Sequence, residues 1–370
     1  MLVGAWIALG VAGIGLRQVD RVRFARRRGD EPRSTTVPAV LERQRSHANN
    51  ITPTLLLVGH WLEIAAWWGL GAAIGPAFLV VAAVMVSVKF RHLQETSHFA
   101  AHGVLFRSLR TGDAVTDLAA HAPLGFAPVP TRRERHVRQH HPNAAVPGVD
   151  PNLDELVRAG IRPGASTPAF IAGVLFPLTP RGSADTVRGI AGNLRAGGWW
   201  RTLLFVAVPA AAYAVGGLPL LIAGYAIPRL LIYPQLAWMS LLVEHTWFDD
   251  VPDGGDAPDD RNVAAQKVET EAARCIRLYR ARPLAELLAR SLWLPYGDLY
   301  HFAHSAHPSV RWNYLRLVDE LLGSPGRTAG HVIFGRDSVL AALRRVTAPS
   351  NAPRRPRVPV RSPISAQRMP

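Results

Sequence analysis

Long uncharged blocks alternate with short, strongly charged segments along this chain. Residues 51–88 contain one charged side chain, Glu63, and residues 202–243 contain one, Arg229. A helix needs about 20 mostly apolar residues to cross a bilayer, so each block is long enough to cross twice. Glycine and proline interrupt each block near its middle, near Gly71 to Pro76 in the first block and at Gly216, Gly217 and Pro219 in the second. The pattern therefore predicts two helical hairpins with very short outer turns.

Two further apolar stretches extend this picture. Residues 1–16 are short for a membrane span, and we interpret them as an uncleaved anchor because they lack a preceding basic residue and a small-residue cleavage signal. Residues 166–178 are too short to cross and predict an interfacial or re-entrant segment. We expect an all-α polytopic membrane protein of helical hairpins with a cytoplasmic histidine-rich cap. It has four spanning helices, or five if the N-terminal segment also crosses.

The same pattern divides the chain into three parts. Residues 1–50 form the apolar anchor and a basic segment, and residues 51–345 form one membrane domain. Residues 346–370 contain six prolines and five arginines with almost nothing to bury, so we predict a disordered basic tail.

The net charge of +15 comes almost wholly from arginine, since Lys89 and Lys267 are the only lysines. Arginines crowd residues 17–45, 132–138 and 344–368, whereas the hairpin turns contain none. Loops rich in basic residues stay in the cytoplasm, so the distribution favours membrane orientation over nucleic-acid binding as the reason for the charge. We therefore expect an integral protein of the cytoplasmic or plasma membrane, with its site facing the cytoplasm and no nucleic-acid partner.

Nine of the fourteen histidines fall in four clusters at the predicted cytoplasmic ends of the apolar segments. They are His98 and His102 in HFAAHG, His136, His140 and His141 in HVRQHH, His245 in VEHTW, and His301, His304 and His307 in YHFAHSAHP. Neutral imidazole is the commonest side-chain ligand for borderline metals such as iron. The lone Cys275 excludes a cysteine-ligated cluster and an internal disulfide, so the clusters predict a histidine-bound metal site.

The spacing within the clusters predicts which rings share a helix face. His98 and His102 are four residues apart, and His136 and His140 repeat that interval, so each pair is expected to reach one metal ion. His141 points about 100° away from His140 on a helix. This offset allows the HxxxHH cluster to contact two ions.

The number of rings predicts a dinuclear centre. His301 and His304 are three apart and are again expected on one face, and His245 lies where a late apolar helix emerges into the cytoplasm. One metal ion accepts about four to six ligands, so eight or nine imidazoles are too many for a single ion. Two neighbouring irons can bind dioxygen and remove hydrogen from an unactivated carbon. The predicted cofactors are therefore two iron ions, with dioxygen as co-substrate.

The order of the clusters resembles the integral membrane di-iron family of fatty acid desaturases and related hydroxylases, over roughly residues 52–318. HFAAHG is similar to the first histidine box of that family, RHVRQHHPN with DPN at 150–152 to the second, and YHFAHSAHPSVRWNYL to the third. VEHTW is similar to the extra histidine at the end of a late transmembrane helix. The resemblance implies that the iron ligands are His98, His102, His136, His140, His141, His245, His301 and His304.

The resemblance also implies a reaction and partners. We expect oxygen-dependent insertion of a double bond into a fatty acyl or lipid chain, with electrons from a separate donor such as ferredoxin and its reductase. The alternative is hydroxylation of an alkyl chain by the same oxidant, because HxxxHH is similar to alkane hydroxylases of the superfamily and many acyl desaturases have HxxHH. A non-catalytic membrane metal carrier is a third hypothesis.

Only Ser305 supports that third hypothesis, because it occupies the last histidine position of the third box. His307 lies two residues later, and we include it among the predicted ligands as a replacement for the missing histidine. Helical spacing turns His307 some 120° from His301, so it reaches the site only if the helix ends or distorts before Pro308. Otherwise one iron lacks a ligand.

Several other ionisable groups adjoin the clusters. Glu244 is expected to accept the second ring N–H of a liganding histidine. His92 lies about 240° around a helix from His98, so a shared site would need a bend and a purely structural role is favoured; any functional role would be to support a ligand and not to bind metal. His60 lies mid-membrane, where either a functional role or a simple internal hydrogen bond explains it. Cys275 is expected to be a reduced thiol without a special role.

Overall fold

The computed structural model describes residues 2–25, 34–248, 270–271, 274–278, 283–323, 327–328 and 338–349. The predicted all-α class is confirmed, since the only strands in these ranges are β1 (Ile276–Arg277) and β2 (Arg327–Thr328), which pair in parallel. The sequence also predicts a solvated acidic loop at residues 249–261, and this loop and most of the predicted tail lie outside the described residues.

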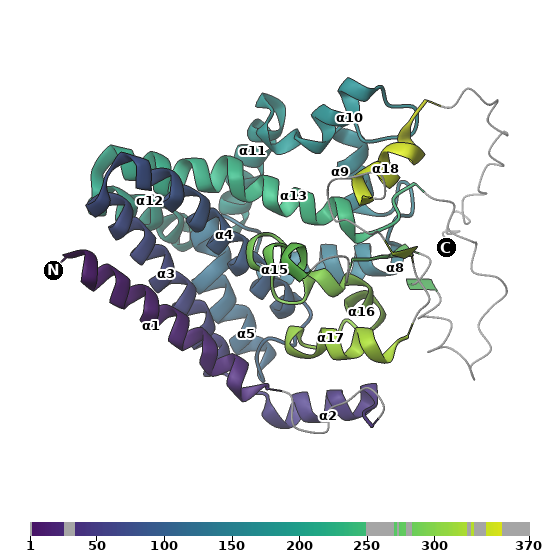
Figure 1. Cartoon of the computed structure of the whole chain (residues 1–370), viewed down its shortest axis with the longest axis horizontal. Coiled ribbons are helices and arrows are strands. Elements are labelled where there is room, and N and C mark those ends of the chain that lie inside the picture. The colour runs from purple at the N-terminus through teal and green to yellow at the C-terminus, as the bar shows by residue number, and fades with distance from the viewer. Residues whose placement is uncertain are drawn as a thin grey trace, which may run out of the picture.

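Four helical segments of the described chain are long and apolar enough to cross a membrane, which confirms the polytopic prediction. They are α1 (Leu2–Arg23), α3 (Thr52–Ile74), α4 (Pro76–Ala101) and the run Trp199–Glu244. They lie side by side at one end of the molecule, and the short helices gather at the other end (Figure 1).

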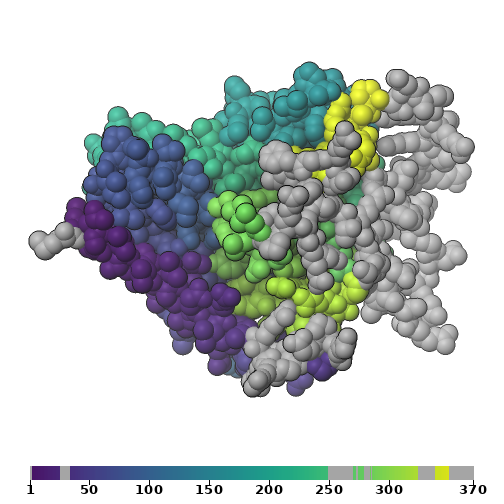
Figure 2. Space-filling model, viewed as in Figure 1, coloured from purple at the N-terminus to yellow at the C-terminus, as the bar shows by residue number. Residues whose placement is uncertain are grey.

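The first hairpin is formed by α3 and α4. Gly75 separates them with a φ of +118°, a conformation that favours glycine, and Pro76 begins α4, where its missing N–H costs no hydrogen bond. Helix α1 lies along α3 on the outside of the bundle (Figures 1 and 2). A Cβ at either Gly13 or Gly59 would lie 2.6 Å from the other's carbonyl oxygen, so this contact requires glycine on both helices.

The second hairpin is the run from Trp199 to Glu244. It comprises α12 (Trp199–Leu221), the π-helical turns η4 (Ile222–Ala226) and η5 (Pro228–Ile232), and α13 (Tyr233–Glu244). The chain reverses at Gly216–Gly217, where Gly217 has a φ of +64°. The rings of Phe205 and Tyr225 then meet edge to face across the hairpin, with their centroids 6.2 Å apart. A Cβ at Gly216 would lie 3.1 Å from Ala72, so both hairpin turns are at the same end of the bundle.

The remaining helices are mostly short, and most of them form a cap at the opposite end from these turns (Figure 1). They are α2 (Val37–His47), α5 (Leu109–Thr116), η1 (Asp117–His121), α6 (Ala122–Leu124), α7 (Val129–Arg133), η2 (Glu134–His140), α8 (His141–Asn143), α9 (Pro151–Arg158), α10 (Thr167–Val174), η3 (Phe176–Leu178), α11 (Pro180–Gly197), α15 (Pro283–Leu292), η6 (Asp298–Tyr300), α16 (His301–Ala306), α17 (Trp312–Leu321) and α18 (Val339–Thr347). The predicted interfacial segment corresponds to α10 and η3, which pack on α13 through the hydrogen bond from Trp238 Nε1 to the Gly173 carbonyl at 2.9 Å.

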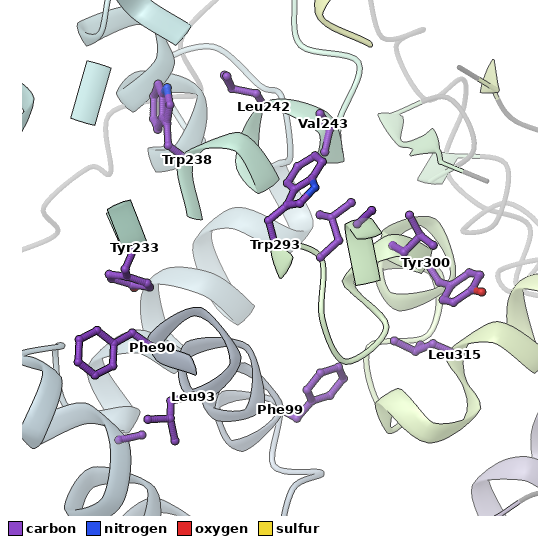
Figure 3. Close-up of a cluster of buried hydrophobic side chains, with 14 of the residues drawn as sticks. Phe90, Leu93, Phe99, Tyr233, Trp238, Leu242, Val243, Trp293, Tyr300 and Leu315 are labelled. Atoms are coloured by element: carbon purple, nitrogen blue, oxygen red, sulfur yellow. The ribbon is translucent and has the colours of Figure 1, made fainter. Parts of the chain in front are cut away.

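One hydrophobic core continues from the long helices into the cap. Phe90 and Phe99 of α4, Tyr233 of α13 and Trp293 after α15 are all buried in it (Figure 3). This packing fixes the cap-side ends of α4 and α13 against α15, α16 and α17. All four predicted histidine clusters lie at or beside these ends.

Candidate metal centre

Five histidines form a first group at the end of α4. They are His98, His102, His136, His141 and His304, and one ring nitrogen of each lies within 4.8 Å of the others. His98 is central, because its Nε2 lies 2.9 Å from His304 Nε2, 3.1 Å from His102 Nε2 and 3.2 Å from His136 Nε2. His141 Nε2 completes the group at 3.1 Å from His136 Nε2.

Three histidines and a carboxylate form a second group beside the first. They are His140, Glu244, His245 and His301, again with ligand atoms within 4.8 Å of one another. His245 Nε2 lies 3.3 Å from His140 Nε2 and 3.1 Å from His301 Nε2. Glu244 Oε2 lies 4.0 Å from His301 Nε2. The structure thus brings together eight of the nine histidines that the sequence singles out.

The HxxxHH cluster contributes rings to both groups, but α-helical spacing predicted a different division of its three histidines between them. His136 pairs with His141 in the first group, and His140 joins the second. The reason is local, because η2 (Glu134–His140) is a π-helix, in which residues five apart come close to the same face. The expectation that His136 and His140 reach one ion is therefore corrected.

The third cluster is also divided between the groups. His304 lies in the first group and His301 in the second, although they are three residues apart on α16. His307 lies in neither group. It follows the last residue of α16, with a φ of −134° and a ψ of 71°, and its N–H donates to the Ala303 carbonyl at 3.0 Å. The helix does end before Pro308, as the sequence required, yet the His307 ring is not brought into either group.

The donor set fits bound metal better than hydrogen bonding among the rings. A ring nitrogen offers one hydrogen or one lone pair, so three Nε2 atoms around His98 Nε2 cannot all be satisfied by hydrogen bonds. Nitrogen ligands sit about 2.1 Å from a bound transition metal, so adjacent ligands of one ion lie about 3 Å apart. The observed Nε2 separations match this spacing.

The protonation state of the rings also fits metal binding. Burial, helped by the charges of Arg132 and Arg133, lowers the pKa of His102 to about 3. Burial likewise lowers the pKa of His301 to about 3. Imidazole binds metal only when neutral, so both groups present ready ligands at neutral pH.

The family model described as fatty acid desaturase matches residues 72–328. This match covers most of the chain and includes all four histidine clusters. The chain belongs to the fatty acid desaturase family. Membership implies a membrane-associated oxidoreductase that acts on lipid or acyl chains. No curated protein matches the chain.

In this desaturase family member, contacts behind the rings orient the second group. His140 Nδ1 donates to Asp150 Oδ1 at 2.8 Å, and the same carboxylate accepts the Ala145 and Asn152 N–H groups at 2.8 and 2.9 Å. His245 Nδ1 donates to the Arg274 carbonyl at 3.2 Å. Such contacts fix the tautomer of a liganding ring, so Nε2 is left facing the group.

Three residues at the second group were missed, or were given a smaller role, when only the sequence was considered. Asp150 is part of the DPN sequence, but nothing in the spacing shows that it receives His140. Glu244 was expected to stand behind a ligand, whereas it lies among the ligand atoms of the group. Cys275 Sγ lies 3.5 Å from His245 Nδ1, in an isolated antiparallel bridge between the two residues. Burial raises the pKa of the Cys275 thiol well above its usual value, so it stays protonated.

A buried arginine connects the surroundings of the two groups. Arg91 donates to Glu95 Oε2 at 2.9 Å and to Ser240 Oγ at 3.0 Å. Ser240 Oγ lies 2.6 Å from Asp298 Oδ2 and 3.1 Å from Glu244 Oε1, and Glu95 Oε1 lies 3.7 Å from His98 Nδ1. Arg91 thus contacts Glu95 beside the first group directly and reaches Glu244 of the second group through Ser240, which ties the end of α4 to the end of α13.

Proposed function

We propose that this family member is an oxygen-dependent di-iron desaturase that introduces a double bond into a fatty acyl or lipid chain. The observation that carries the proposal is the pair of adjoining ligand groups, built from eight histidines and Glu244. Two irons held by these groups would supply, with dioxygen, an oxidant able to remove hydrogen from a methylene.

The chain's own residues would hold and shield this chemistry. His98, on the long helix α4, places the first group where the apolar span meets the cap. Buried aromatic side chains, among them Phe99 and Trp247, lie against His98 and His245 and exclude water from the rings. An acyl chain would enter from the bilayer, where the apolar span of α4 leads to the first group.

The distribution of charge supports a cytoplasmic site. The histidines of η2 share their segment with Arg135 and Arg138, while the hairpin turns at Gly75 and Gly216–Gly217 have no charged neighbours in sequence. Basic segments remain in the cytoplasm, so the cap would face that compartment. Electrons would come from a separate donor such as ferredoxin and its reductase.

Hydroxylation is the second candidate, favoured by the HxxxHH spacing. The two reactions differ in the fate of the substrate carbon, because desaturation removes two hydrogens and hydroxylation adds one oxygen. Lipids from cells that express the protein, grown under labelled dioxygen, separate them by mass spectrometry. Unlabelled product lacking two hydrogens supports desaturation, and labelled hydroxylated product supports the alternative.

The matched control removes one ligand from each group, His136→Ala with His301→Ala. We expect the new product to disappear in this variant, because neither group retains its full donor set. A product that persists would contradict a role for the two groups in the reaction. Iron analysis of the purified wild type tests the non-catalytic hypothesis, which predicts fewer than about one iron per chain.

A further inference from the structure

A second set of aromatic and ionisable side chains lies outside both histidine groups, between α3, α4 and the turn after α15. The His60 Nε2 atom and the Tyr296 hydroxyl are 2.6 Å apart. The rings of His60, His92 and Tyr296 lie 5.5–5.7 Å from one another in edge-to-face arrangements. The sequence left His60 open between a function and an internal hydrogen bond, and the short contact identifies its partner.

The backbone holds Tyr296 in an uncommon conformation. Its φ is +51°, and Gly297 follows with a φ of +87°. A left-handed conformation is unfavourable for a bulky residue and persists only where the surroundings enforce it. Arg91 enforces it from both sides, since it donates to the Trp293 carbonyl at 3.0 Å and pairs with Asp298. The turn therefore presents the phenol to His60 at a fixed position.

A line of aromatic rings connects Tyr296 to the first histidine group. The ring centroids of Tyr296 and Trp312 are 5.7 Å apart, and those of Trp312 and Phe99 are 5.1 Å apart. Phe99 lies 5.8 Å from the ring of His304, a member of the first group. Each step is short enough for electron tunnelling to be fast, and both Tyr296 and Trp312 have oxidisable rings.

We propose that Tyr296, with His60 as its proton acceptor and Trp312 as the intermediate ring, donates an electron to the metal centre when the centre is oxidised without an acyl chain in place. This inference rests on the proposed function, because a di-iron centre oxidised by dioxygen is the oxidant. Tyr296 loses one electron and becomes a neutral phenoxyl radical. The electron reduces the centre by one equivalent, and the phenol proton moves to His60 Nε2.

The short contact with His60 allows the electron and the proton to leave Tyr296 together. Burial raises the pKa of Tyr296 to about 12, so the group is a protonated phenol at neutral pH. Loss of the electron alone would place a second positive charge beside Arg17, whose guanidinium lies next to the phenol. Transfer of the proton over 2.6 Å to His60 Nε2 leaves the phenoxyl ring neutral and moves the positive charge to the imidazole. The relay would protect the centre's ligands from oxidation during unproductive turnover.

Electron paramagnetic resonance tests the relay directly. Reduced, iron-loaded protein is mixed with dioxygen in the absence of acyl substrate and then frozen. We expect a tyrosyl radical in the wild type, identified by ring-deuterated tyrosine. The signal is expected to be lost in Tyr296→Phe and reduced in His60→Gln and Trp312→Phe. Tyr300→Phe is the matched control, because Tyr300 is also buried but donates to Glu286 and keeps the signal.

The outcomes separate the relay from the proposed function. A radical of full size in Tyr296→Phe overturns the relay, as does no radical in a wild type that binds iron and forms product. A wild type that binds no iron contradicts the proposed function instead. In that case a photogenerated one-electron oxidant replaces the centre in the metal-free protein. A radical confined to Tyr296 then supports the relay, and its absence overturns it.

Discussion

The two histidine groups achieve similar ligand spacing by different means. The first uses five imidazoles from the end of α4 and the residue after it, the η2–α8 segment and α16, and three of the five are only half-buried. The second has three imidazoles and Glu244, and all three rings are buried. Two of these rings are also held from behind, by Asp150 and by the Arg274 carbonyl. The first group thus has the larger number of donor rings. The second group has fewer rings, but two of them are held in a fixed orientation.

Removal of one imidazole should therefore have the larger effect in the second group. We expect His245→Ala to lose one iron per chain and all activity, because two imidazoles and Glu244 remain. His102→Ala leaves four imidazoles in the first group and should retain both irons with reduced activity. Iron analysis and product formation on the purified variants measure the difference.

The two variants can be compared directly because each removes one imidazole from a group of candidate metal ligands. Equal loss of iron in the two variants would contradict the distinction between number and orientation. Loss of folding is excluded by comparing the thermal unfolding of each metal-free variant with that of the metal-free wild type.

A smaller effect is expected from the contact behind His140. Asp150→Asn removes the charge that receives His140 Nδ1, so the ring is oriented less firmly. Loss of such a contact typically lowers metal affinity or activity about 10- to 100-fold. Competition with a chelator measures the affinity. Asp154→Asn, an exposed residue of the helix α9 that Asp150 caps, is the control and should bind iron as the wild type does.

Stability of the metal-free protein should depend on pH through both groups. Burial lowers the pKa of His102 and of His301 to about 3, against about 6.5 in an unfolded chain. Between these values the unfolded state binds more protons, so the free energy of unfolding falls as pH drops below about 6.5. We expect the unfolding temperature of the metal-free protein to decrease over this range. In His301→Gln the decrease should be shallower, and an unchanged slope would contradict the assignment.

The hairpins were predictable because their signals are local. An apolar length sufficient to span, interrupted by glycine, is enough to place the turns at Gly75 and Gly216–Gly217. The true length of α1 was not predictable in this way, since it continues past residue 16 through charged residues. Those residues find distant partners, Arg17 with Glu63 and Asp20 with Arg311, and no local pattern reveals such pairs.

The candidate site shows the same limit. The histidine clusters and their convergence follow from spacing and family resemblance, but the assignment of each ring to a group depends on helix type. The π-helical turn of η2 places His136 with His141, whereas α-helical geometry places it with His140. The carboxylate of Glu244 likewise enters the second group only because the end of α13 lies beside α16.

The smallest effect is expected at His307, the one predicted ligand that lies in neither group. His307→Gln should bind as much iron as the wild type and form as much product, because the ligand atoms of both groups remain in place. His304→Gln, in the same short segment, is the matched comparison and should weaken the first group. If His307→Gln lost iron, the His307 ring would have to act as a donor to the second group, in place of the histidine that the family resemblance implies at Ser305. Glu244 would then be insufficient as the fourth donor. The second group, like the first, would depend on the number of its donors and not on their orientation.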